Sequence, residues 1–162
     1  MTTVDVGKAA EGLRVVLVDP RPERRELMGH LVASTGLAAT GIAEAATALE
    51  AMDVLDREDR DVAVVEIQMP VSEGLKAIAA LRARSSGLHI VVCSFVRDSA
   101  TKALALAEGA DAYLDKPVNS DALKTLFQEF SLPRAVAEVA GPPETADRKR
   151  PAASRARRAK SE

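Results

Sequence analysis

The sequence predicts an α/β fold in which five parallel strands form one sheet with helices on both of its faces. Short apolar runs rich in β-branched residues, which are typical of strands, alternate along residues 13–130 with stretches of helical periodicity. The strand segments are apolar almost throughout, as expected for strands that are buried on both sides. Strands and helices that alternate in this way form βαβ units, and such units build a parallel sheet.

The first half of this region is expected to contain three strands and two helices. The strands are expected at residues 14–18, 38–43 and 62–67, and the helices at residues 22–35 and 44–56. Pro22 suits the first turn of a helix, where its missing N–H costs no hydrogen bond. Gly36 directly follows the first helix, and glycine is typical of that position because it tolerates a left-handed backbone.

The second half is expected to contain three helices and two strands. The helices are expected at residues 72–84, 98–108 and 120–130, and the strands at residues 89–94 and 111–115. We expect Ser72 to cap the first of these helices, because serine accepts hydrogen bonds from the free N–H groups at a helix start. Asn119 or Ser120 is expected to cap the last helix, and Gly109 follows the second helix as a C-cap.

The C-terminal part of the chain differs in composition from the rest. Residues 148–162 contain seven Lys or Arg and one acidic residue, a net charge of +6, so the preceding residues carry −8 of the total of −2. Gly141-Pro142-Pro143 interrupts any helix, and the residues after it cannot bury enough apolar surface to offset their ordering entropy. We therefore expect a flexible N-terminus at 1–12, a domain at 13–130, a linker at 131–140 and a disordered basic tail at 141–162.

Several classes of protein are excluded by what the sequence lacks. The single cysteine, Cys93, does not allow an internal disulfide, and its apolar neighbours indicate a buried thiol. The N-terminal residues contain no apolar signal-peptide core, and no run is long enough to span a bilayer, so we expect a cytoplasmic protein. Because no Ser/His/Asp set, Cys/His set or glycine-rich phosphate loop can be assembled, we do not expect an enzyme.

Polar residues stand at the carboxyl ends of four of the expected strands. Asp19 follows the first strand and Glu66 lies at the end of the third. Ser94 ends the fourth strand, and Lys116 follows the fifth. Ligands of open parallel sheets bind beyond the carboxyl ends of the strands, so we expect these four side chains to converge on one site.

Four segments give the chain a resemblance to the response-regulator receiver domain. They are Val-Leu-Val-Asp-Pro-Arg-Pro (16–22), Asp-Val-Ala-Val-Val-Glu-Ile-Gln-Met-Pro-Val-Ser-Glu-Gly (61–74), Ile-Val-Val-Cys-Ser-Phe (90–95) and Glu-Gly-Ala-Asp-Ala-Tyr-Leu-Asp-Lys-Pro (108–117). The resemblance covers residues 13–130 and implies the flavodoxin-like (βα)5 fold, with strand order 2-1-3-4-5. It also implies a part in two-component signal transduction or a phosphorelay.

The resemblance implies a Mg²⁺ site and a phosphate-accepting aspartate, but the sequence departs from both. Asp19 matches the first acidic residue of the metal site, whereas Pro20 replaces the second and removes a charge and two oxygens from it. Glu66 stands at the phosphoacceptor position, where its carboxylate is displaced by about 1.5 Å, one C–C bond. Phosphoryl transfer depends on positioning, so we expect no phosphorylation and weak or absent Mg²⁺ binding. Asp19 can belong to this pocket or can cap the following helix.

The remaining family positions are Ser94 and Tyr113, which match the switch residues, and Lys116, which matches the pocket lysine. We expect Glu66 to pair with Lys116 and with the Ser94 hydroxyl. The carboxylate would then imitate part of a phosphorylated state permanently, with one negative charge against about 1.5 to 2 for a phosphoryl group. Phe95 stands where a small residue is usual, and we expect its bulk to restrict the Tyr113 ring.

These departures predict an atypical, stand-alone receiver, or pseudo-receiver, that signals by constitutive, phosphorylation-independent protein–protein interaction. The resemblance implies that its partner binds a face formed by residues 99–108, 111–115 and 121–130, where a homodimer can also form. No effector domain follows, so we expect the effector to be a separate protein. Two alternatives stay open: a receiver phosphorylated by a histidine kinase, and a regulator whose tail, residues 148–160, binds nucleic acid or an acidic partner.

Overall fold

A computed structural model describes residues 12–38, 41–68 and 70–132 of the chain. Five parallel strands form one sheet in the order β2-β1-β3-β4-β5, which is the fold class and strand order predicted from the sequence. The strands are β1 (Val15–Val18), β2 (Ile42–Ala45), β3 (Val62–Val65), β4 (His89–Ser94) and β5 (Ala112–Asp115). The helices are α1 (Pro22–Ser34), α2 (Ala48–Arg57), α3 (Val71–Arg84), α4 (Ser99–Glu108) and α5 (Ser120–Phe130).

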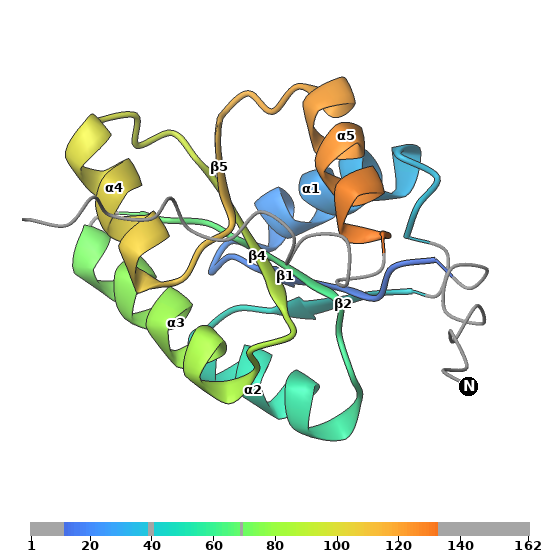
Figure 1. The fold of residues 1–162 in the computed structure, drawn as a ribbon, viewed down its shortest axis with the longest axis horizontal. Coiled ribbons are helices and arrows are strands. Elements are labelled where there is room, and N and C mark those ends of the chain that lie inside the picture. The colour runs from blue at the N-terminus through green and yellow to red at the C-terminus, as the bar shows by residue number, and fades with distance from the viewer. Residues whose placement is uncertain (1–11, 39–40, 69, 133–162) are drawn as a thin grey trace, which may run out of the picture.

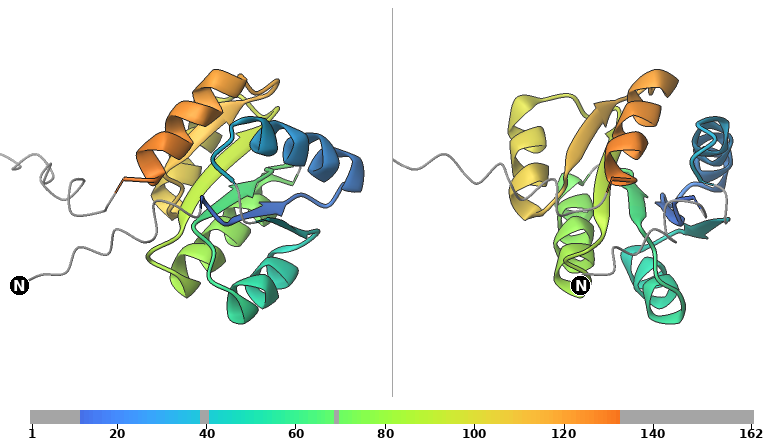
Figure 2. Two further views of the ribbon diagram at one scale, coloured as in Figure 1. Left: turned by 90° about the vertical axis from the view of Figure 1, so that its right-hand side faces the viewer. Right: turned by 45° about the vertical axis from the view of Figure 1, so that its right-hand side comes forward.

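Helices cover both faces of the sheet, as Figure 1 and Figure 2 show. Helices α1 and α5 lie on one face, and α2, α3 and α4 lie on the other. Each face has its own apolar core, because successive side chains of a strand point to opposite sides. Val16 and Val65 belong to the core beneath α2–α4, whereas Leu17 and Val64 belong to the core beneath α1 and α5. Within the described residues, no helix is long and apolar enough to cross a membrane.

Most element boundaries agree with the expectations. Strand β4 and helix α5 begin and end as predicted. The side-chain oxygen of Asn119 accepts hydrogen bonds from the N–H groups of Asp121 and Ala122 at 2.8 and 3.2 Å, so Asn119 and not Ser120 caps α5. Gly36 and Gly109 both follow helices with a positive φ, of 71° and 120°. Residues 1–11 and 133–162 lie outside the described residues, and they include most of the expected N-terminal segment (1–12), most of the linker (131–140) and all of the basic tail (141–162).

The second strand and second helix begin later than expected. Strand β2 spans Ile42–Ala45, so it begins and ends later than the expected 38–43: Gly41, with a φ of 102°, directly precedes it, and pairing with β1 begins at Ile42. Helix α2 begins at Ala48 and not at residue 44, since Thr47 accepts a hydrogen bond from the Glu50 N–H at 3.1 Å. Thr and Glu three residues apart are the sequence pattern of a capping box, a signal of this helix start, although the Glu50 carboxylate here accepts from the Ala46 N–H at 2.6 Å and not from that of Thr47.

Two further expectations about local structure were wrong. Ser72 does not cap α3, because the helix begins at Val71 and its N-cap, Pro70, makes no side-chain hydrogen bond. Strand β3 ends at Val65 and not at residue 67. Glu66 therefore lies just beyond the strand, where its N–H still continues the ladder by donating to the Val18 carbonyl at 3.0 Å.

The carboxyl-terminal turn of α4 is held against α3 by Arg82. The Arg82 guanidinium donates to the carbonyl of Gly109 at 2.8 Å and to that of Leu88 at 2.7 Å, and it pairs with Asp111 at 2.9 Å. A Cβ atom on Gly109 would lie 2.7 Å from the Arg82 Cγ, well inside van der Waals contact. Gly109 is therefore required both by its positive φ and by this close approach.

Gly109→Ala is expected to destabilise the domain more than Gly41→Ala. Both substitutions place a side chain at positive φ, which costs about 1–3 kcal/mol. Only Gly109→Ala also meets a neighbour, since nothing lies within 4 Å of the Cβ position at Gly41, and such overpacking costs a further ~1–3 kcal/mol. Urea denaturation measures both free energies of unfolding. Equal losses would show that the Arg82 contact does not constrain this turn.

Candidate functional site

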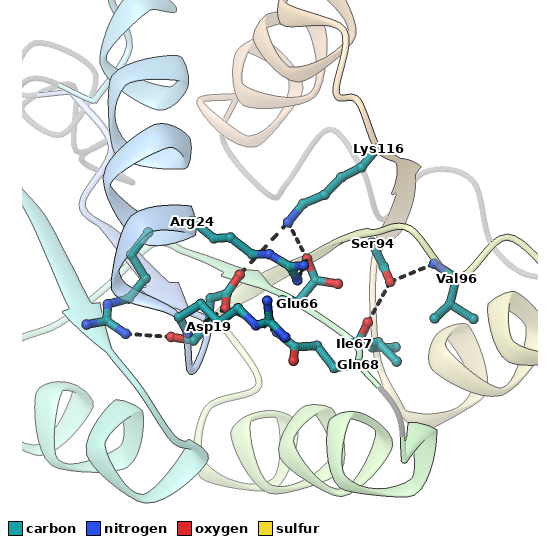
Figure 3. A network of polar contacts seen from close by, with 10 residues as sticks. Asp19, Arg24, Glu66, Ile67, Gln68, Ser94, Val96 and Lys116 are labelled. Atoms are coloured by element: carbon teal, nitrogen blue, oxygen red, sulfur yellow. Dashed lines mark hydrogen bonds and ion pairs between the residues drawn. The ribbon is translucent and has the colours of Figure 1, made fainter.

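The polar residues at the strand ends converge at one edge of the sheet, as expected (Figure 3). Asp19, Glu66, Ser94 and Lys116 are all buried there. Backbone hydrogen bonds continue the pairing of the parallel strands up to these residues. The Asp19 N–H donates to the Ala45 carbonyl at 3.1 Å, and the Lys116 N–H donates to the Ser94 carbonyl at 2.9 Å. The sheet thus fixes the Cα positions of these four residues, and their side chains form a polar pocket.

The centre of the pocket is an ion pair between Lys116 and Glu66. The Lys116 ammonium donates a hydrogen bond to Glu66 Oε2, and the two side chains are only 11% and 3% exposed. This is the contact expected from the sequence. Arg24 of α1, which the sequence analysis did not single out, places a guanidinium nitrogen 4.0 Å from the same oxygen. A buried carboxylate needs such partners, because an unpaired charge in the interior is very unfavourable.

Asp19 belongs to the pocket and does not cap α1. Helix α1 begins at Pro22, and its N-cap, Arg21, makes no side-chain capping hydrogen bond. One carboxylate oxygen of Asp19 accepts from the Arg21 N–H at 2.9 Å, which forms a turn before the helix, and from the Gln68 amide at 3.3 Å. The other oxygen lies 3.9 Å from the Lys116 ammonium. Lys116 therefore lies between two carboxylates.

The residues of this pocket do not fit the Mg²⁺ ion that the resemblance to receiver domains implies. Mg²⁺ needs several oxygen ligands in near-octahedral geometry, and Pro20 offers no side-chain oxygen. The carboxylates of Asp19 and Glu66 are already near the cations of Lys116 and Arg24. Within the described residues, no three His, Cys, Asp or Glu side chains gather in a way that could hold a metal ion.

Ser94 does not bind Glu66, contrary to expectation. Its hydroxyl donates to the Ile67 carbonyl at 2.7 Å and accepts from the Val96 N–H at 3.0 Å (Figure 3). A serine hydroxyl can donate only one hydrogen bond. Because the Ile67 carbonyl accepts it, none is left for the Glu66 carboxylate. Ser94 consequently ties the end of β3 to the loop between β4 and α4.

Tyr113 holds the same loop from its other side. Its hydroxyl donates to the Val96 carbonyl at 2.5 Å, and its ring lies 5.6 Å from the Lys102 ammonium. Burial raises the pKa of Tyr113 further above its ordinary value, at which the phenol is already protonated and able to donate at neutral pH. Both backbone groups of Val96 are thus engaged, the N–H by Ser94 and the C=O by Tyr113.

Phe95 lies over the cations of the pocket and not beside the Tyr113 ring. Its ring centroid is 5.6 Å from the Arg24 guanidinium carbon and 5.5 Å from the Lys116 ammonium, and the residue is 58% exposed. No ring contact joins Phe95 to Tyr113 in the part of the chain that the structure describes. The expectation that Phe95 restricts the Tyr113 ring was therefore wrong. The Phe95 ring instead lies near the cations of Arg24 and Lys116.

Cys93 is a buried thiol, as predicted. Burial raises its pKa to about 12, so very little thiolate exists at neutral pH. The thiol next to this pocket is accordingly a core side chain and not a nucleophile.

Known proteins with a similar sequence or structure support the assignment that the geometry suggests. A family model described as the response regulator receiver domain matches residues 15–128. The chemotaxis protein CheY of Halobacterium salinarum is 27% identical over 126 residues, which are 78% of this chain and 95% of that protein. A protein-glutamate methylesterase/protein-glutamine glutaminase of Bradyrhizobium diazoefficiens is 33% identical over 118 residues, which are 72% of this chain and 30% of that larger protein.

A solved structure gives the same result. The crystal structure of a two-component response regulator of the LuxR family from Aurantimonas superposes with a TM-score of 0.65 at 25% sequence identity. The superposition covers 74% of this chain and 85% of the other. The chain therefore belongs to the response regulator receiver family.

Proposed function

We propose that this receiver signals by constitutive, phosphorylation-independent contact with a partner protein, with Glu66 in place of the phosphoacceptor aspartate. The observation that carries the proposal is the buried ion pair between Glu66 and Lys116. A phosphoryl group on a receiver adds negative charge beside the pocket lysine. Here a carboxylate that is part of the chain already supplies such a charge, so the arrangement needs no phosphate donor.

The hydrogen bonds around Val96 connect this pocket with a surface. Ser94 and Tyr113 engage both backbone groups of Val96, and the Tyr113 ring faces Lys102 of α4. Lys102 in turn pairs with Asp115 of β5 at 2.8 Å. These contacts run from the end of β4 to α4 and β5, and we propose that they relay the state of the pocket to the side of the domain formed by α4, β5 and α5.

We propose this α4–β5–α5 side as the binding surface. Leu106 of α4, one helical turn after Lys102, is about half exposed and adds apolar area to the surface that carries the Lys102–Asp115 pair. An apolar centre with a polar surround is typical of protein interfaces. A second copy of this chain is one partner that fits it, and sedimentation equilibrium separates that case from a different protein.

One alternative function is supported by specific residues. Asp19, Ser94 and Lys116 occupy the family positions in the pocket, and the relatives include chemotaxis proteins. These features favour a working receiver that is phosphorylated by a histidine kinase. Glu66 is longer than the usual aspartate, and Pro20 offers no side-chain oxygen to a metal ion, which makes this the weaker proposal.

Incubation with acetyl phosphate and Mg²⁺ is expected to leave the protein unmodified. Glu66 is longer than aspartate and its carboxylate is paired with Lys116, so in-line transfer should be slowed ~100-fold or more. Intact-protein mass spectrometry of the wild type and of Glu66→Gln should give two unchanged masses. A stoichiometric phosphoryl adduct on the wild type that is absent from Glu66→Gln would instead establish the working receiver.

Deletion of residues 141–162 tests the nucleic-acid alternative, which depends on a tail outside the described residues. We expect an almost unchanged melting temperature, because a segment of this composition cannot bury enough apolar surface to form part of a core. If the full-length protein binds nucleic acid, binding should weaken steeply with salt and disappear on deletion. Fluorescence anisotropy with a labelled duplex measures both effects. Salt-insensitive binding by the truncated protein would contradict this account of the tail.

A further inference from the structure

Arg24 lies in the first turns of α1 with its guanidinium directed into the pocket, as Figure 3 shows. Its terminal nitrogen is 4.0 Å from Glu66 Oε2, the same oxygen that Lys116 contacts. The Arg24 side chain is 30% exposed, so its charge lies at the mouth of the pocket and is only partly screened by water. Glu66 is thus flanked by two cations that come from different elements of the fold.

These cations balance the acidic residues of the pocket. Two carboxylates, Asp19 and Glu66, face two side-chain cations, Lys116 and Arg24. A pocket with equal numbers of positive and negative groups offers little attraction to a further cation. Any divalent ion bound near Glu66 would also lie close to the guanidinium, and like charges at such distances repel strongly.

Phe95 is placed to hold the guanidinium in this position. Its ring centroid lies 5.6 Å from the Arg24 guanidinium carbon, within the range of a cation–π contact. Phe95 directly follows Ser94, whose hydroxyl is fixed by Ile67 and Val96. The backbone that carries the ring is therefore anchored, and the ring gives Arg24 a second contact besides Glu66.

We infer that Arg24 is a built-in cation of this pocket, which balances Glu66 and excludes Mg²⁺ independently of Pro20. Two features of the sequence then act together: Pro20 removes a ligand, and Arg24 supplies a positive charge where a metal ion would otherwise be needed. This inference deepens the proposed function and rests on it, because it assumes that Glu66 keeps the pocket permanently in one state. In this inference Arg24 balances the charge of Glu66, and Phe95 holds the Arg24 guanidinium in place; neither takes part in phosphoryl transfer.

Restoring the missing ligand tests whether Arg24 acts independently. In Pro20→Asp, Mg²⁺ should still bind weakly, because the guanidinium remains. Adding Arg24→Met, which keeps much of the side-chain length without the charge, should strengthen Mg²⁺ binding about 10-fold or more. Isothermal titration with MgCl₂ gives the affinities, and the melting temperature with and without Mg²⁺ gives a second readout.

Two matched variants make the test specific. Pro20→Asp with Arg21→Met removes an equal charge from the neighbouring exposed arginine and should bind Mg²⁺ like Pro20→Asp alone. Pro20→Asp with Arg24→Lys keeps a cation at the position and should also resemble Pro20→Asp. Equal affinity of Pro20→Asp and its Arg24→Met derivative, whether both bind or neither does, would overturn the inference. An adduct with acetyl phosphate in the wild type would contradict the proposed function instead, so the two failures can be distinguished.

Discussion

The ion pair between Lys116 and Glu66 is the contact on which the rest of the pocket depends. Each partner extends from a different strand end, and both are almost fully buried. Removing one partner of a buried pair typically costs about 3–5 kcal/mol, because the other charge is left without compensation. The surrounding groups show how this cost is limited: Asp19 lies 3.9 Å from Lys116, and Arg24 lies 4.0 Å from Glu66. The pocket is a small network of charges and not an isolated pair.

The neighbouring loop is held by neutral hydrogen bonds that do not involve Glu66 directly. The Ser94 hydroxyl donates to the carbonyl of Ile67, the residue after Glu66, and accepts a hydrogen bond from the Val96 N–H. Tyr113 completes the set at the Val96 carbonyl. A change at Glu66 can therefore reach the loop only by displacing the backbone beside it, at the Ile67 carbonyl that Ser94 contacts.

The sequence predicted the fold well because the dominant signals are local and strong. Val62–Val65 and His89–Ser94 are apolar segments of strand length, and buried parallel strands require such segments. The start of β2 could not be placed in this way, because it depends on pairing with β1 and on the positive φ of Gly41. The start of α2 was missed although Thr47 and Glu50 have the spacing of a capping box and Thr47 caps the helix.

The sequence predicted which residues form the site better than it predicted the contacts between them. Four strand-end residues converge because topology alone brings them together. Which atom the Ser94 hydroxyl binds depends on distances of a few tenths of an ångström, which no sequence pattern specifies. Arg24 was missed, yet it carries a signal: a basic residue in the first turns of a helix opposes the helix dipole, which indicates a specific partner such as Glu66.

The central claim is that the pocket is already set by Glu66, and NMR of the Val96 amide and the Tyr113 ring tests it most directly. These groups report on the loop beside the pocket. Beryllium fluoride with Mg²⁺ imitates a phosphoryl group on a receiver carboxylate, and we expect it to leave the wild-type resonances unchanged. Glu66→Gln, which keeps the shape but not the charge, should shift them without unfolding the domain. Wild-type resonances that move on addition of beryllium fluoride, together with unchanged resonances in Glu66→Gln, would contradict the account.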